Sequence, residues 1–210
     1  MSTISPRDAD YFHALQTRTG WGHTLEKFAA WVNPQPGCRA LDVGCGPGLL
    51  PRILQEQACH AFGVDLDPQS FRPPRLHSAL AAADACRLPF PNAAFDLITA
   101  TNLLFLLPAP EQALTEIARL LRPGGRLALL NPTPALTATA AARFADQKGL
   151  TGLARTSLLQ WAQRAEHRAP WTPETYPALL ERFGVQWERS HTTIGPGFAV
   201  WVCARRLPPE

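Results

Sequence analysis

The stretch that decides the fold is Leu41-Asp42-Val43-Gly44-Cys45-Gly46-Pro47-Gly48. In it an apolar segment ends in an acid, and glycine then occupies every second position. Glycine has no Cβ, so the backbone of such a loop can turn sharply and approach a ligand closely. A loop of this kind between a strand and a helix builds a nucleotide-type site at the carboxyl edge of a parallel sheet. We therefore predict a ligand site at Asp42, Gly44, Cys45, Gly46 and Gly48, with Cys45 present because the loop needs a small residue.

The spacing of the glycines argues against a dinucleotide or a nucleoside triphosphate as the ligand. The dinucleotide fingerprint G-x-G-x-x-G/A would place its third small residue at Leu49, whereas the third glycine is Gly48. No Gly-Lys-Ser/Thr follows, which excludes a P-loop. Asp42 would repel a pyrophosphate and suits a ligand with positive charge. S-adenosylmethionine (SAM) carries an adenosine, a sulfonium and an ammonium group without phosphate, and fits better than NAD.

At this point the chain resembles the class I SAM-dependent methyltransferases, because the stretch from Asp42 to Gly48 reads as their first motif. The small-molecule group, which includes the quinone-ring methyltransferases, is the most similar, and the resemblance runs from about Cys38 to Asn131. It implies an α/β fold of the Rossmann-like, doubly wound type. In that fold a mostly parallel seven-stranded sheet ends in an antiparallel C-terminal hairpin and carries a helical lid. The implied enzyme moves the SAM methyl group to a small-molecule acceptor and releases S-adenosyl-L-homocysteine.

A second acid follows the next apolar segment, Ala61-Phe62-Gly63-Val64-Asp65. Asp65 lies nineteen residues after Gly46, close to the distance at which an acid binds the ribose in nucleotide-binding βαβ units. A carboxylate can accept protons from both ribose hydroxyls at once. We expect Leu66 to pack on one face of the adenine. The alternative is that Asp65 is a turn residue or a helix N-cap.

Two later stretches complete the predicted cofactor site. The stretch Ala83-Asp84-Ala85-Cys86-Arg87-Leu88-Pro89-Phe90 resembles the exit of the third strand in the family. The resemblance implies that Asp84 accepts a hydrogen bond from the adenine amino group and that the Ala85 N–H reaches a ring nitrogen. Thr101 and Asn102 follow a predicted strand and are expected to face the methionine part of SAM.

The helix predicted over Glu111–Leu121 is expected to be purely structural. Its apolar residues recur at helical spacing, and Arg122-Pro123-Gly124-Gly125 ends it. No histidine lies in a motif, so no catalytic residue is assigned and the catalytic group stays unknown. The histidines share no metal-ligand spacing either, so no metal is expected.

The length of 210 residues and the hydrophobic content of 46% predict one methyltransferase domain over 1–210. Its expected parts are an N-terminal helical cap (1–37), a SAM-binding core (38–131), a helical lid (132–183) and a closing hairpin (184–206). In the lid, one helical face runs from Leu150 to Ala165, and a second helix is predicted to start at Thr172 as its N-cap. Trp161, Trp171 and Tyr176 either line the acceptor site or form the core of the lid.

The charge and the cysteine content limit the partners and the cellular compartment that we expect for this protein. The net charge is +3 and the arginines are scattered, so no nucleic-acid partner is expected. No segment reaches the length of a membrane span, and residues 1–6 lack the blocks of a signal peptide. Five cysteines without a C-x-x-C pair indicate reduced thiols in a cytoplasmic protein. We expect the protein to be a monomer or a homodimer. The alternatives are a SAM-binding domain without turnover and a methyltransferase acting on protein or RNA.

Overall fold

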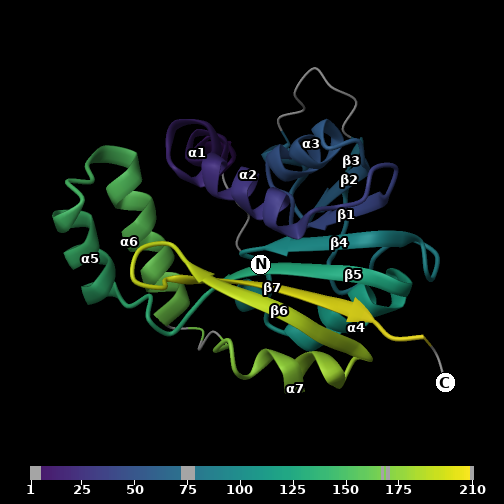
Figure 1. Ribbon diagram of the computed structural model, residues 1–210. Coiled ribbons are helices and arrows are strands. Elements are labelled where there is room, and N and C mark those ends of the chain that lie inside the picture. Colours follow the sequence, from purple (N-terminus) through teal and green to yellow (C-terminus); the bar gives the residue numbers. More distant parts are fainter. Residues whose placement is uncertain (1–5, 72–78, 167, 169–170, 209–210) are drawn as a thin grey trace.

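A seven-stranded sheet forms the centre of the protein, in the order β3-β2-β1-β4-β5-β7-β6 (Figure 1). The computed structural model describes residues 6–71, 79–166, 168 and 171–208, so residues 1–5 of the predicted cap lie outside it. Neighbouring strands from β3 to β5 run parallel, and β7 lies antiparallel between β5 and β6. This confirms the predicted mostly parallel sheet with an antiparallel C-terminal hairpin. The strands are β1 (Arg39–Val43), β2 (His60–Asp65), β3 (Ala79–Ala82), β4 (Phe95–Thr101), β5 (Leu121–Pro132), β6 (Val185–Thr193) and β7 (Ala199–Arg206).

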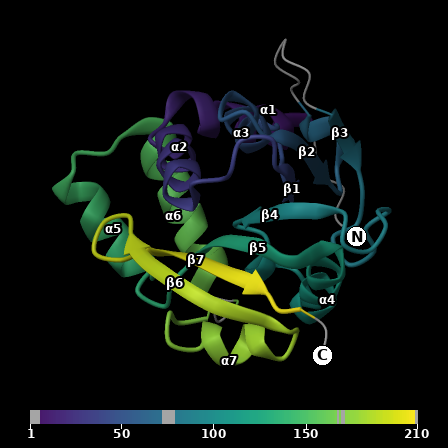
Figure 2. The same ribbon diagram turned by 45° about the vertical axis from the view of Figure 1, so that its right-hand side comes forward.

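Helices cover both faces of the sheet, as Figures 1 and 2 show. Residues of α2 and α3 form one apolar core with the sheet, and residues of α4 and α7 form another on the opposite face. Because the central parallel strands are buried on both faces, they are apolar almost throughout. The helices are α1 (Pro6–Arg18), α2 (Trp21–Val32), α3 (Leu49–Glu56), α4 (Pro110–Leu120), α5 (Ala138–Gln147), α6 (Gly152–Glu166) and α7 (Tyr176–Glu181), with 3₁₀ turns η1 (Pro68–Ser70) and η2 (Leu104–Leu106).

The segment predicted as a lid divides into two parts. The helices α5 and α6 share a small apolar core that includes Leu158 and Phe198, beside the tip of the β6–β7 hairpin (Figure 1). The helix α7 instead packs against β6 and the main core, where Tyr176 is fully buried. Within the segment predicted as a lid, α5 and α6 are therefore the helices that could cover the carboxyl edge of the sheet.

Two local expectations in this segment were incomplete or wrong. No helix was predicted at α5, an alanine-rich stretch that starts after Thr137, whose hydroxyl accepts a hydrogen bond from the Ala140 N–H. The helix expected from Thr172 begins only at Tyr176. The Thr172 carbonyl accepts from the Thr175 N–H at 3.1 Å and from the Thr175 hydroxyl at 2.9 Å. This turn holds the chain outside the helix for four residues.

Candidate functional site

The glycine-rich loop joins the end of β1 to the start of α3 at the carboxyl edge of the sheet. Its glycines have φ angles of 76° (Gly44), 51° (Gly46) and 91° (Gly48), a region that L side chains rarely adopt. The N–H groups of Gly44 and Cys45 donate to the Val64 carbonyl at 2.8 and 3.0 Å. These bonds tie the loop to the end of β2, the strand that carries Asp65.

The three glycines differ in what surrounds them. A Cβ at Gly44 would lie 2.9 Å from the Leu103 side chain, and one at Gly48 would lie 2.8 Å from Leu80. A Cβ at Gly46 would meet nothing within 4 Å. Gly44 and Gly48 therefore permit close packing of the protein on itself, whereas the backbone at Gly46 borders open space. The buried Cys45 Sγ lies 2.8 Å from where a Cβ of Gly63 would stand, so the absence of a side chain at Gly63 leaves room for Cys45.

Asp65 meets the glycine loop directly. Its Oδ2 accepts a hydrogen bond from the Gly46 N–H at 2.8 Å, and its Oδ1 accepts one from the Asp67 N–H at 3.1 Å. Each carboxylate oxygen can accept more than one hydrogen bond, so capacity for two hydroxyl donors remains. Burial raises the pKa of Asp65 above its ordinary value. The N-cap role falls to Asp67, which caps η1 by accepting from the Gln69 N–H at 2.9 Å.

The residue after Asp65 is a large apolar side chain in an unusual setting. Leu66 is 70% exposed, one of the exposed large hydrophobic residues of the described chain. Single exposed apolar side chains are common on protein surfaces, and this one is accessible to a ligand. Its predicted contact with an adenine ring stays a prediction that fits this exposure.

Asp42, by contrast, is 1% exposed at the end of β1. Its Oδ1 accepts a hydrogen bond from the Thr99 hydroxyl of β4 at 2.7 Å. Burial raises the pKa of Asp42 from 3.8 to about 7, and the Thr99 hydrogen bond opposes that rise. A cation placed beside this carboxylate would favour its ionised form, which is what the predicted sulfonium and ammonium groups of SAM would do.

The predicted adenine-binding residues follow β3, next to Asp65. The Ala83 N–H donates to the Asp65 carbonyl at 2.9 Å, so the next residue, Asp84, lies near the end of β2. Asp84 is exposed, and its Oδ1 accepts from the Cys86 N–H at 2.8 Å. Ala85 is buried. The structure thus brings Asp84 and Asp65 to neighbouring strand ends, and their roles toward a ligand stay predictions.

Thr101 and Asn102 lie half-buried at the end of β4. Asn102 has a φ of 55°, and its N–H donates to the Leu130 carbonyl at 2.7 Å. Its Oδ1 accepts a hydrogen bond from the Trp161 Nε1–H of α6 at 3.1 Å. The Trp161 ring in turn makes an edge-to-face contact with Trp21 of α2, with centroids 5.8 Å apart.

The bond between Trp161 and Asn102 was not predicted, although both residues were named as candidates. They are 59 residues apart in sequence, and no local pattern links them. Tyr176, the other candidate that the structure buries, belongs to the core: its hydroxyl accepts from the Asn131 Nδ2 at 3.0 Å, and burial raises its pKa. Trp171 packs against Tyr176, with ring centroids 6.2 Å apart. Of the three aromatic residues, Trp161 is therefore the one with a described hydrogen bond to a predicted site residue.

The described part of the chain contains no group of three or more metal-ligating side chains. His77 and His167 lie outside the described residues. The five cysteines are free thiols. Within the same ranges, no helix has the length and apolar content that crossing a membrane requires.

Comparison with known proteins agrees with this geometry. Residues 41–129 match a family described as a methyltransferase domain. Residues 41–129 therefore carry a methyltransferase domain. The matched residues begin at the glycine loop and end in β5, so they include every predicted cofactor residue.

Relatives of this methyltransferase domain include two proteins named ubiquinone biosynthesis O-methyltransferase. The one from Xylella fastidiosa is 37% identical over 102 residues, which cover 45% of this chain and 42% of that protein. The one from Xanthomonas axonopodis pv. citri is 35% identical over 133 residues, which cover 55% and 52%. The chain therefore spans about half the length of the curated relatives it matches.

Solved structures share the fold over nearly the whole chain. A SAM-dependent methyltransferase from Aquifex aeolicus has a TM-score of 0.64 at 15% identity, covering 98% of this chain and all of that one. An S-adenosylmethionine-dependent methyltransferase from Mesorhizobium loti has a TM-score of 0.64 at 20% identity, covering 89% and 97%. At such identities the likeness concerns the fold alone.

Proposed function

We propose that this protein binds SAM at the carboxyl edge of the sheet and transfers its methyl group to a small-molecule acceptor. The observation that carries the proposal is the hydrogen bond from Gly46 to Asp65 beside open space at Gly46. It joins an acceptor for ribose hydroxyls to a backbone that a ligand can approach closely. We also propose that residues 1–210 act as one domain with the cap, core, lid and hairpin described above.

The residues at this edge suit the separate parts of SAM. We assign the ribose to Asp65, the adenine to Leu66, Asp84 and Ala85, and the methionine end to Asp42, Thr101 and Asn102. When bound, SAM supplies a methyl group on a sulfonium, which is already a good leaving group. The chain must then hold the acceptor in line with that methyl group and exclude water, which can supply about 7–11 kcal/mol of the barrier.

The acceptor site is proposed between α2, α6 and the end of β4. Trp161 and Trp21 are half-buried there and mainly apolar, and the names of the relatives support a small acceptor that is methylated on oxygen. We infer that no nucleic acid takes part and that the reaction runs in the cytoplasm, where the five free thiols stay reduced. The oligomeric state proposed is a monomer or a homodimer.

Calorimetry with SAM, S-adenosylhomocysteine and NAD tests the binding part of this proposal. We expect saturable binding of the first two ligands and much weaker binding of NAD. Tighter binding of NAD than of SAM would overturn the assignment. A mixed panel of phenolic, quinol and amine acceptors with methyl-labelled SAM tests turnover, and SAM binding without transfer to any acceptor would favour a binding domain without catalysis.

A further inference from the structure

The predicted adenine-binding residues lie in a segment with little regular structure of its own. Between β3 and β4, residues 83–94 contain one isolated β-bridge, from Asp84 to Arg87. The strand before them, β3, is at the edge of the sheet and has only four residues. Something other than a β-ladder must therefore keep Asp84 and Ala85 in place.

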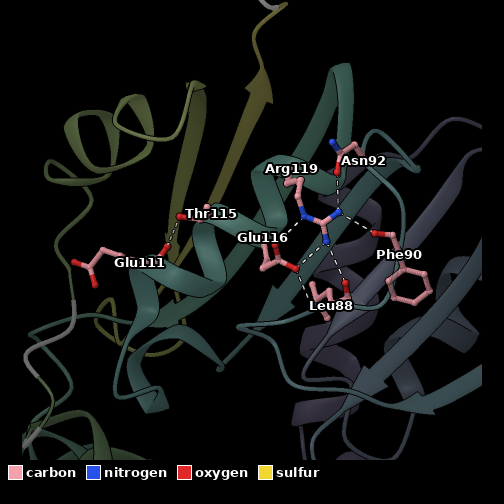
Figure 3. Close-up of polar contacts among 7 residues, drawn as sticks. All are labelled: Leu88, Phe90, Asn92, Glu111, Thr115, Glu116 and Arg119. Carbon is pink, nitrogen blue, oxygen red and sulfur yellow. Dashed lines mark hydrogen bonds and ion pairs between the residues drawn. The ribbon is translucent and has the colours of Figure 1, made fainter.

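Two residues of α4 bind this segment at several points (Figure 3). The Glu116 Oε2 accepts a hydrogen bond from the Leu88 N–H at 2.8 Å. The guanidinium of Arg119 donates to the Leu88 carbonyl at 3.1 Å, the Phe90 carbonyl at 2.9 Å and the Asn92 Oδ1 at 2.8 Å. The backbone adds a further bond, from the Ala93 N–H to the Arg119 carbonyl at 3.0 Å.

Glu116 and Arg119 also fix each other. The Arg119 Nε and Nη2 donate to the two carboxylate oxygens of Glu116, both at 2.8 Å, which is the bidentate geometry of a strong ion pair. Together with the three bonds to the loop, every one of the five guanidinium N–H groups has an acceptor. Arg119 therefore has no donor left for a ligand, and its contacts serve to hold the segment after β3. We call the pair Glu116 and Arg119 the clamp.

The clamp acts close to the predicted adenine contacts. Leu88 is buried and is held through both its N–H and its carbonyl, and it follows Ala85 by three residues. A displacement of Leu88 would move the Ala85 N–H and the Asp84 carboxylate, because so few rotatable bonds lie between them. Both groups must match the adenine edge within a few tenths of an ångström for good hydrogen bonds.

We propose that Glu116 and Arg119 are positioning residues for adenine recognition, which hold the segment 84–92 so that Asp84 and Ala85 fit the base. The proposal rests on the proposed function, because it assumes that this edge of the sheet binds an adenosine. The two residues touch no ligand themselves. They act through the loop, so they govern selectivity for the base rather than the presence of the site.

The test compares binding of S-adenosylhomocysteine with that of S-inosylhomocysteine, in which a carbonyl replaces the adenine amino group. In the unchanged protein, we expect a preference for the adenine ligand of at least about tenfold, since Asp84 would lose a donor and face an oxygen. In Arg119→Met, we expect affinity for the adenine ligand to fall about tenfold and the preference to shrink to about threefold or less. A purely structural role for Arg119 would lower both affinities together and leave their ratio unchanged.

Arg205→Met is the matched control. Arg205 of β7 likewise donates to a carboxylate (Glu188, 2.6 Å) and to a carbonyl (Gly124, 3.0 Å), but it lies at the amino end of β5. Its replacement is expected to leave the preference unchanged. If Arg119→Met does not fold, Glu116→Gln serves, because it keeps an acceptor for Leu88 while removing the charge; we expect it to reduce the preference about threefold.

The outcomes separate this proposal from the proposed function. If the unchanged protein binds neither homocysteine ligand, the proposed function fails. If the unchanged protein binds and discriminates but the preference is the same in a folded Arg119→Met, the clamp plays no part in base recognition. If Arg119→Met does not fold, an unchanged preference in Glu116→Gln leads to the same conclusion. A reduced preference with an unaffected Arg205 variant supports it.

Discussion

Asp42→Asn is expected to stabilise the folded protein at neutral and alkaline pH. Asp42 is 1% exposed, and burial raises its pKa from 3.8 to about 7. Since the folded state binds this proton more tightly than the unfolded state, the contribution of Asp42 to the free energy of unfolding falls as pH rises from about 4 through 7 and is lowest above that range. Asparagine resembles the protonated acid and can still accept the Thr99 hydrogen bond.

The magnitude follows from the two pKa values. One pKa unit is worth about 1.36 kcal/mol, so the ionised Asp42 costs the folded state about 4 kcal/mol at pH 8. At pH 5 the same linkage gives a cost of about 1.7 kcal/mol. The stability difference between Asp42→Asn and the unchanged protein should therefore widen by about 3 kcal/mol between pH 5 and pH 8.

Urea unfolding at pH 5 and pH 8 measures this difference, with Asp146→Asn as the control. Asp146 is an exposed acid in an ion pair with Arg155, so its replacement should change the free energy of unfolding by less than about 1 kcal/mol at both pH values. A difference for Asp42→Asn that stays constant with pH, or narrows toward pH 8, would refute the reasoning. The same variant should bind SAM more weakly, because it can no longer supply a negative charge.

Three further changes test the site. Asp65→Ala should weaken binding of S-adenosylhomocysteine by about 1–3 kcal/mol in calorimetry, since a charged acceptor is lost; unchanged affinity would remove Asp65 from the site. Gly46→Ala should weaken the same binding by at least about tenfold, because its Cβ occupies the open space that the ligand needs. The control Gly124→Ala has the same kind of positive φ and open surroundings far from the site, and should cost about 1 kcal/mol of stability without affecting binding. Trp161→Phe keeps a ring but removes the donor to Asn102, so turnover should fall about tenfold while affinity for S-adenosylhomocysteine changes less than about threefold; equal losses in both would contradict a role on the acceptor side.

The edge of the sheet that we propose as the cofactor site has strong signals in the sequence, because those signals are local. The acid and the glycines lie within eight consecutive residues, and Asp65 follows at a spacing that one helix and one strand determine. The structure brings Gly46 and Asp65 into direct contact, whereas the spacing predicted only that both belong to one site. The mostly parallel direction of the strands also agreed, since apolar strands alternating with helices lead to a parallel sheet.

Other features could not be found from such patterns. Glu116 and Arg119 belong to a helix that the sequence marks only as structural, yet their side chains reach residues 27 to 31 positions earlier. Tyr176 lies in the segment predicted to cover the site, but α7 carries it to the core beneath the sheet. In both cases the packing of a helix on the sheet decides which groups its side chains meet.

The sequence by itself determined the kind of fold and predicted the edge of the sheet where we propose that a ligand binds, because backbone freedom at glycine and the periodicity of apolar residues act over a few neighbours. Only the tertiary structure decided which side chains support that edge. The bond from Trp161 to Asn102 and the clamp of α4 on the loop after β3 join residues that are distant in sequence. Such contacts arise from the way whole helices and strands pack on one another, and short-range sequence patterns do not predict that packing.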